Sequence, residues 1–302
     1  IQLSQMLFRP LRQIADKFNT LQMGMVAAKR VFEILDSNYY INDSGNINSK
    51  DLNGDIKFEN VNFSYTKNNN VLNDINLTIK KGEKIAIVGA TGSGKSTIIK
   101  LIMRLYDIKD GEIKINNKNI KNFKLSDLRS SISLVNQDIF LFADTILKNI
   151  TLFNEELSKK DVVKAAQNIG VWNFINKLPG GLDYNVKERG VMLSEGQRQI
   201  ISFLRAYVSK PNILILDEAT SSIDSKTEEL IQFATNKIIQ NKTSIIIAHR
   251  LSTIINSDKI VVMKSGNIME IGSHNDLINK NGYYKKLYES QFEKKELFAE
   301  IF

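Results

Sequence analysis

Gly89-Ala90-Thr91-Gly92-Ser93-Gly94-Lys95-Ser96-Thr97 is the stretch on which the fold of this 302-residue chain depends. The β-branched apolar run at 84–88 predicts a buried strand, and the run at 98–105 predicts a helix. In this context the pattern G-x-x-x-x-G-K-S/T indicates a phosphate-binding loop, whose glycines let successive backbone N–H groups turn toward an anion at the start of the helix. We expect Lys95 to reach the β- and γ-phosphates of a nucleotide and the Ser96 hydroxyl to hold Mg²⁺.

The composition is that of an ordinary soluble globular protein, with 42% hydrophobic and 25% charged residues. The length suggests about two domains. The absence of cysteine excludes disulfides and thiolate metal sites. The net charge of +8 could indicate an anionic partner. No dense basic cluster stands out, so we expect a solvated lysine-rich surface and no nucleic-acid partner. No apolar run approaches the ~20 residues of a membrane helix.

The N-terminal segment, residues 1–36, has the period of a helix with an a/d-like apolar seam. The seam residues recur at alternating spacings of four and three: Leu7, Leu11, Ile14, Phe18, Leu21, Met25, Ala28, Phe32 and Leu35. This helix could be an isolated coiled-coil arm or the end of a longer helix. Because the chain begins with Ile1 and not Met, we expect a fragment of something longer.

Turn-forming residues dominate 37–54, which predicts a linker, and the pattern changes to short strands from Asp55. Strands are expected at 56–59, 61–65, 71–79 and 132–135, with a hairpin turn at Asn116-Asn117. Residues 138 to about 190 predict helices and loops, with Ser158 as a helix cap. The continuous apolar runs at 213–216 and 244–248 are typical of central parallel strands. A last strand pair, 259–263 and 267–270, and a final helix at 283–299 complete the expected order.

A second phosphate signal follows at Leu214-Ile215-Leu216-Asp217-Glu218, an apolar strand that ends in two carboxylates. A central strand of an α/β sheet delivers its carboxyl end to the ligand crevice. Asp217 would be a ligand of magnesium there, directly or through water. Glu218 lies one residue further and would polarise a water in line with the γ-phosphate.

Between the two signals, Leu193-Ser194-Glu195-Gly196-Gln197 opens an expected helix over 196–209. At this point the chain resembles the ATP-binding cassette (ABC) ATPases, whose signature reads LSGGQ, and the resemblance covers about residues 55–290. It implies a P-loop α/β core with an antiparallel β-subdomain and an inserted helical subdomain at about 138–200, all within an ATPase domain at 55–302. It also implies that ATP and Mg²⁺ are bound, and that the signature binds the ATP of a partner subunit in a head-to-tail dimer.

The resemblance assigns further residues by their place in the chain. Tyr65 falls where the family has an aromatic residue that stacks on adenine. Gln137 falls at the glutamine loop, which touches magnesium and the transmembrane domain. The segment 222–224 matches the loop after the second phosphate motif, and His249 matches the switch histidine near the γ-phosphate. Lys95, Glu218 and His249 would then be the catalytic residues.

One position departs from the family pattern, because Glu195 replaces the first signature glycine. A carboxylate that faced the γ-phosphate would repel it about as strongly as a close ion pair attracts. We therefore expect Glu195 to point away from the nucleotide, while Ser194 and the following backbone N–H groups still serve it.

Glu188-Arg189-Gly190, just before the signature, is similar to the E-R-G stretch with which exporters of this family contact coupling helices. Residues 9–36 also resemble the end of the last transmembrane helix of a half-transporter. These likenesses imply the ATPase domain of a multidrug or lipid exporter at the cytoplasmic face of the membrane, preceded by a transmembrane domain in the same polypeptide. The alternatives are a soluble cassette ATPase that acts on ribosomes or DNA, and a regulatory cassette that binds ATP without hydrolysing it.

Overall fold

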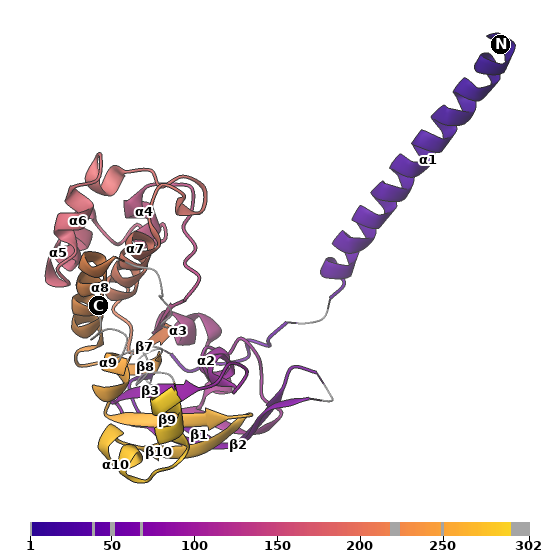
Figure 1. Cartoon of the computed structure of the whole chain (residues 1–302). Coiled ribbons are helices and arrows are strands. Elements are labelled where there is room, and N and C mark those ends of the chain that lie inside the picture. The colour runs from indigo at the N-terminus through magenta and orange to yellow at the C-terminus, as the bar shows by residue number, and fades with distance from the viewer. Residues whose placement is uncertain are drawn as a thin grey trace. The chain divides into compact units, whose positions relative to one another are not determined.

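The computed structural model describes residues 2–37, 40–48, 52–66, 69–217, 224–248 and 251–290. The chain divides into two compact units, Ile1–Asn42 and Asp43–Phe302 (Figure 1).

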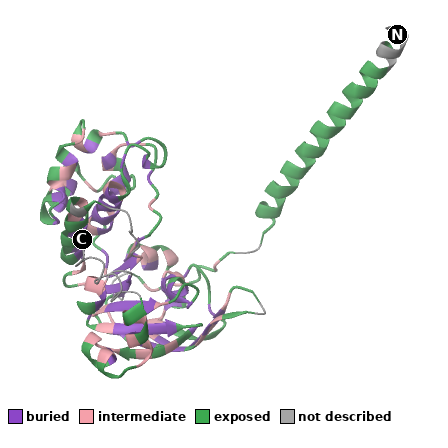
Figure 2. Cartoon of the chain, viewed as in Figure 1, coloured by how far each residue is buried: buried purple, intermediate pink, exposed green. Residues whose placement is uncertain are grey.

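The first unit is a single helix, α1 (Gln2–Leu35), with Pro10 inside it. The helix is coloured as exposed along its described length (Figure 2). Large apolar residues of the predicted seam, among them Leu11, Phe18 and Leu21, are exposed. The predicted helix is therefore present, and its seam has the form of a surface that needs a partner. Among the described residues, no helix combines the length and apolar character needed to cross a membrane.

A six-stranded sheet forms the centre of the second unit, in the order β10-β9-β3-β8-β7-β6. Its parallel strands are β3 (Lys84–Gly89), β6 (Ile132–Val135), β7 (Ile213–Asp217), β8 (Thr243–Ile247) and β9 (Lys259–Lys264). The edge strand β10 (Asn267–Gly272) pairs with β9 antiparallel. The central strands are buried on both faces, which explains why their sequences are continuously apolar.

This sheet separates two hydrophobic cores. In β3, β7, β8 and β9, residues with even numbers, such as Ala86, Leu214 and Ile246, belong to one core, which they form with helices. Their odd-numbered neighbours belong to the other core, which also contains residues of α2 (Lys95–Ile102) and of the second sheet. The alternation follows from the two-residue period of a strand. The doubly covered parallel sheet is the α/β core that the sequence predicts.

The second sheet is antiparallel and four-stranded, in the order β2-β1-β4-β5. Its strands are β1 (Ile56–Ser64), β2 (Asn70–Ile79), β4 (Asp110–Ile115) and β5 (Lys118–Asn119). The two short strands expected at 56–59 and 61–65 are one strand, which passes an irregularity at Asn60 in the left-handed region (φ 49°). Asn116 and Asn117 both have positive φ, as the predicted hairpin turn requires.

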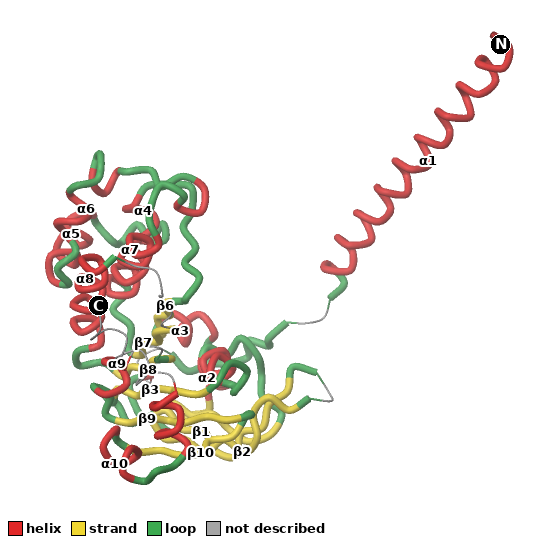
Figure 3. The backbone as a smooth tube through the Cα atoms, in the orientation of Figure 1, coloured by secondary structure: helices red, strands yellow, loops and turns green. Residues whose placement is uncertain are grey.

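Helices account for most of the remainder (Figure 3). One group gathers between β6 and β7: α4 (Ile146–Thr151), α5 (Lys159–Asn168), α6 (Trp172–Asn176), η3 (Gly181–Asp183), η4 (Glu188–Gly190) and α7 (Glu195–Val208). Ser158 caps α5 in a capping box with Asp161, as predicted. The others are η2 (Ile120–Asn122), α3 (Leu125–Ser130), α8 (Ser225–Ile239), α9 (Leu251–Ile255), α10 (His274–Asn279) and α11 (Tyr283–Tyr288). The final helix is shorter than expected within the described residues, and α10 was not predicted.

Part of the segment expected to be a linker packs onto the second unit. Ile47 forms a parallel bridge with Phe123, and the backbone N–H groups of Asn46 and Ile47 donate to the Asn122 carbonyl. Leu52 is fully buried. The sequence analysis did not predict these contacts, because the composition of 37–54 is typical of turns and the partner residues lie far along the chain.

Candidate functional site

The phosphate loop joins β3 to α2 in a conformation that needs glycine. Gly89, Gly92 and Gly94 all have positive φ. A Cβ on Gly94 would lie 2.7 Å from Leu72 Cδ2, and one on Gly89 would collide with the Met263 carbonyl oxygen. The loop is therefore wedged between β2 and β9, and glycine is required there for space as well as for φ.

Lys95 is the buried cation of this loop. Its side chain is 9% exposed, and its Nζ donates to the carbonyl oxygens of Gly89 (2.7 Å) and Ala90 (3.0 Å). Burial lowers the pKa of the Lys95 ammonium, and the carboxylate of Asp217 opposes that shift. Gly94 supplies no side-chain cap to α2, and the buried Ser93 Oγ has no hydrogen-bond partner. The loop thus presents a cation and free polar groups at the start of a helix, as an anion requires.

Among the described residues, the phosphate loop, Asp217 and Gln137 lie at the carboxyl end of the parallel strands. Asp217 ends β7 and lies opposite Ile247 of β8, and Ile247 lies opposite Ile87 of β3, two residues before the phosphate loop. Gln137 follows β6, the neighbour of β7, and is exposed. The carboxyl ends of these parallel strands therefore bring the loop, Asp217 and Gln137 to the crevice where α/β sheets bind ligands.

These donors fit magnesium. Ser96 is exposed in the first turn of α2, Asp217 is half-buried, and Gln137 contributes an exposed amide. All three offer hard oxygen atoms, and magnesium in nucleotide sites is usually bound by one or two carboxylates together with phosphates and water. No group of three or more His, Cys, Asp or Glu side chains with metal-binding placement occurs within the described ranges.

Tyr65 lies just after β1 and beside α2. Its Oη is 3.2 Å from Thr97 Oγ1, within the phosphate-loop motif, and 43% of the residue is exposed. An aromatic ring so placed can meet the base of a nucleotide whose phosphates lie in the loop.

The signature segment forms the N-terminus of α7. Ser194 is the N-cap: its Oγ accepts from Gln197 N–H (3.3 Å), and its own N–H donates to Gln197 Oε1 (3.0 Å). Leu193 and Gly196 are buried, whereas Ser194 and Glu195 are exposed. Glu195 lies in the first turn, where a carboxylate stabilises a helix.

Glu218 and His249 lie outside the described residues, as do Ser222 and Ile223. Asp224, which follows them, caps α8 by accepting from Thr227 N–H (3.0 Å). Hydrogen bonds from Thr227 hold the pKa of the Asp224 carboxyl below its usual range. The roles assigned to Glu218 and His249 remain predictions.

Two polar residues were missed by the sequence analysis. Asn149 is fully buried, and its side chain bonds both backbone groups of Phe142 (2.8 and 3.0 Å). Arg205 of α7 donates to the carbonyl oxygens of Asn149 (2.9 Å) and Phe140 (3.3 Å), and burial lowers the pKa of its guanidinium. The two residues tie the signature helix to the segment after Gln137. A charged residue amid the apolar run of α7 was the available signal.

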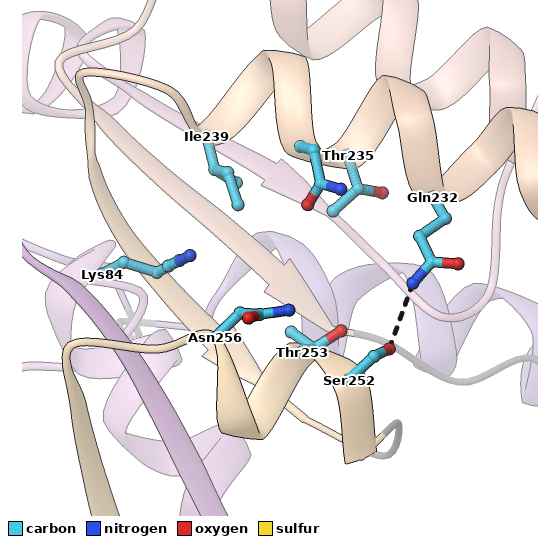
Figure 4. A pocket seen from close by; sticks show the side chains of 8 residues that line it. Lys84, Gln232, Thr235, Ile239, Ser252, Thr253 and Asn256 are labelled. Carbon is cyan, nitrogen blue, oxygen red and sulfur yellow. Dashed lines mark hydrogen bonds between the residues drawn. The ribbon is translucent and has the colours of Figure 1, made fainter. Parts of the chain in front are cut away.

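A small polar pocket lies away from this site, at the amino end of β3 (Figure 4). Its walls include Lys84, Asn256 and the hydrogen-bonded pair Gln232 and Ser252 (3.2 Å). The cavity measures about 20 Å³, which is room for one ordered water and not for a nucleotide.

Comparison with known proteins places this geometry in context. The sequence model described as ABC transporter matches residues 72–221. The ABC transporter ATP-binding protein YknV of Bacillus subtilis is 43% identical over 288 residues, which are 95% of this chain and 48% of that protein. An ATP-dependent lipid A-core flippase of Methylobacillus flagellatus is 43% identical over 289 residues, which are 95% of this chain and 49% of that protein.

Among solved structures, a bacterial Atm1-family ABC exporter with ATP bound matches with a TM-score of 0.79 and 35% identity, over 95% of this chain and 50% of that one. The chain spans about half the length of the curated relatives it matches.

Proposed function

Because the chain belongs to the ABC transporter family, we propose that it binds and hydrolyses ATP to power an exporter. It carries an ATP-binding domain of that family. The reaction is the hydrolysis of ATP to ADP and phosphate, coupled to transport. The transported compound is a lipid or another hydrophobic molecule, a proposal supported by relatives named lipid A-core flippases.

The residues act mainly by position and charge, as phosphoryl transfer requires. Lys95 leaves the loop carbonyls and pairs with the β- and γ-phosphates, while the backbone N–H groups before α2 hold the remaining oxygens. Ser96, Asp217 and Gln137 would hold Mg²⁺, which neutralises charge on the phosphates when it is bound. Glu218 accepts a proton from the attacking water, and His249 contacts the γ-phosphate side.

The observation that carries this proposal is the convergence of Lys95, Asp217 and Gln137 at one sheet edge. The signature belongs to a second site. Ser194 is exposed at the N-terminus of α7, where it can bind the ATP of another copy. Two such copies, arranged head to tail, complete each other's sites.

A transmembrane domain is the proposed second partner. Phe140 and Phe142, shortly after Gln137, form an exposed aromatic cluster with Phe153, and consecutive ring centroids are 5.2 and 5.8 Å apart. A Cβ on Gly190 of the E-R-G turn would lie 2.7 Å from Leu141 Cδ1, so the turn packs beside this cluster. Exposed aromatic side chains of this kind mark protein interfaces. The helix α1 would continue from that domain, at the cytoplasmic face of the membrane.

The test is the release of phosphate from ATP by the purified chain with magnesium. The wild type should hydrolyse ATP, and Glu218→Gln should bind ATP but hydrolyse it at a small fraction of the rate. Lys237→Ala, on α8, is the matched control and should match the wild type. A wild type that binds ATP without turnover would support a regulatory cassette instead.

A further inference from the structure

We propose that Tyr106 and Lys100 are positioning residues that hold the Tyr65 ring in the orientation needed for base stacking. The inference rests on the proposed function, because it takes ATP as the ligand and Tyr65 as the residue that meets its base. Neither residue belongs to the motifs that the sequence analysis identified.

The Tyr65 ring is held on two sides by other aromatic rings. The Tyr106 ring meets it edge to face, with centroids 5.0 Å apart and an interplanar angle of 84°. The buried Phe63 ring meets it in the same manner at 4.9 Å and 86°. Phe63 and Tyr106 also contact each other at 5.8 Å. Edge-to-face contacts of this kind favour one ring orientation over others.

The phosphate-loop helix holds the same ring from another direction. Lys100 Nζ of α2 stands 5.4 Å from the centre of the Tyr65 ring, a cation–π distance. Thr97, three residues earlier on α2, contacts Tyr65 Oη at 3.2 Å. Tyr65 is therefore linked to the helix that begins with Lys95. The position of the ring that would meet the base is thus fixed relative to the phosphate loop.

Tyr106 is itself well fixed, although it lies in a turn. Arg104, just before it, is buried in the left-handed region (φ 47°), and its Nε bonds Asp107 Oδ1 (2.9 Å). Arg129 donates to the Arg104 carbonyl (2.9 Å), and Leu105 N–H donates to the Lys100 carbonyl (2.8 Å). These bonds thus hold the residues on either side of Tyr106 against α2 and α3.

Tyr65 and Tyr106 are not buried core residues. Tyr65 is 43% and Tyr106 is 42% exposed, so the two rings are ordered against each other while remaining open to solvent. An aromatic surface that is already ordered and accessible lowers the entropic cost of binding a ligand. This is the property expected of a prepared platform for a nucleobase.

The experiment compares two ligands by titration calorimetry on the whole 302-residue chain, with magnesium present. ATP reports on base and phosphates together, and inorganic tripolyphosphate reports on the phosphate loop alone. Tyr106→Ala and Lys100→Met should each weaken ATP binding by about two- to ten-fold, the range expected for one aromatic or cation–π contact. Tripolyphosphate binding should stay within about two-fold of the wild type.

Conservative variants separate positioning from a general loss of structure. Tyr106→Phe keeps the ring, and Lys100→Arg keeps a cation that stacks on aromatic rings, so both should bind ATP like the wild type. Lys237→Met is the matched control, because Lys237 Nζ stands 5.6 Å from the Phe233 ring on α8. It removes a similar contact elsewhere and should change neither ligand's affinity.

Equal losses for ATP and tripolyphosphate in Lys100→Met would overturn the inference, because the lysine would then be a phosphate ligand. Unchanged ATP affinity in Tyr106→Ala, or a gain in Lys100→Met, would also overturn it. A wild type that binds both ligands equally well would refute the platform and leave the phosphate site standing. A wild type that binds neither ligand would refute the proposed function and the inference with it.

Discussion

Lys95 shows how a single side chain can be prepared for a ligand. Its ammonium is buried and rests on the Gly89 and Ala90 carbonyls, within the electrostatic reach of Asp217. Carbonyl dipoles are weaker partners for a cation than phosphates are, so an incoming nucleotide can displace them. The fold thus holds the cation at the place where we propose that the phosphates bind.

Lys95→Ala should weaken ATP binding by about 10- to 100-fold, because hydrogen bonds to charged groups contribute about 1.5–3 kcal/mol. The melting temperature should not fall, because the substitution also removes the cost of burying a charge. Calorimetric titration and thermal unfolding measure the two effects. Wild-type ATP affinity in this variant would contradict the phosphate-site assignment.

Glu195 is the residue at which the signature departs from the family pattern. The side chain is exposed in the first turn of α7, where its charge favours the helix. Glu195→Gly should change ATP turnover only a few-fold, with a small loss of stability from the helix start. A large gain in turnover would show that the carboxylate opposes the γ-phosphate.

His274 makes stability depend on pH. Its Nδ1 lies 2.8 Å from Tyr284 Oη, its ring also meets Tyr288, and burial lowers its pKa. The folded state then binds fewer protons than the unfolded state below about pH 6.5, so stability is complete above that value and falls as the solution is acidified. Urea unfolding at pH 7 and pH 5.5 should show this loss.

His274→Asn should make the loss of stability at acidic pH smaller, and His249, present in both proteins, cancels in the comparison. An identical acid profile for the variant and the wild type would remove His274 as the cause.

On the alkaline side, burial raises the pKa of Tyr284 to about 12. Stability from this group is complete below about pH 10 and is lost as the pH rises toward 12.

At the scale of elements, local signals predicted more than distant ones. The strand before the phosphate loop, the Asn116-Asn117 turn and the Ser158 cap depend on a few adjacent residues, and all three predictions were confirmed. The joining of 56–59 to 61–65 depends on Asn60, whose N–H donates to Asn76 Oδ1 and whose side chain bonds Asp74. No local pattern contains those partners.

The same limit applies to the site. Asp217 was predicted because it ends an apolar strand, and parallel strands bring their carboxyl ends together; Gln137 was assigned only by its resemblance to the family's glutamine loop. Arg205 and Asn149 were missed because their partners are backbone groups brought close only by folding. The six-residue helix α10 was missed because so short a helix depends on its cap, Ser273, and on packing of Leu277 more than on period.

The segment before β1 gives a prediction about an element. Asp43 Oδ1 accepts from Leu125 N–H (2.9 Å) at the start of α3, which lacks a side-chain cap of its own N-cap residue. Ile47 and Lys124 are hydrogen-bonded, and a Cβ on Gly45 would collide with the Phe123 carbonyl. Residues 43–48 therefore stabilise the second unit.

A chain that starts at Asp43 should unfold cooperatively and bind ATP like the full chain. A chain that starts at residue 50 should fold but lose about 1–3 kcal/mol, from one cap and a few hydrogen bonds. Urea unfolding of the two proteins measures the difference. Equal stability would show that 43–48 contributes nothing, and loss of cooperativity in the longer chain would show that the second unit needs α1.

At the scale of the whole molecule, we propose that each chain carries halves of two different sites. Lys95 and Asp217 belong to the phosphate edge of the sheet, whereas the exposed Ser194 caps α7 in the separate helical region. We expect ATP to join two copies, because its phosphates bind the loop of one copy and the signature of the other. Hydrolysis would then remove the γ-phosphate and release the pair.

Glu218→Gln tests this assembly, because it keeps the size and hydrogen bonding of the side chain but removes the base. A positioned base contributes about 10²–10⁴-fold to the rate, so the variant should bind ATP, hydrolyse it slowly and persist as a dimer. Light scattering or sedimentation with saturating ATP measures the dimer. A variant that stays monomeric would count against ATP-driven pairing of this chain, and unchanged turnover would remove Glu218 from its role.

Ser194→Arg in the Glu218→Gln background should abolish the dimer, because a long cation would block the contact with the partner's ATP. The substitution also removes an N-cap, which costs about 1 kcal/mol, and that loss alone could disturb α7. Ser158→Arg is the matched control, because Ser158 caps α5 through the same kind of capping box. If only Ser194→Arg prevents the dimer, the signature acts in trans. If both variants prevent it, the effect lies in helix stability and the assignment of Ser194 to the interface fails.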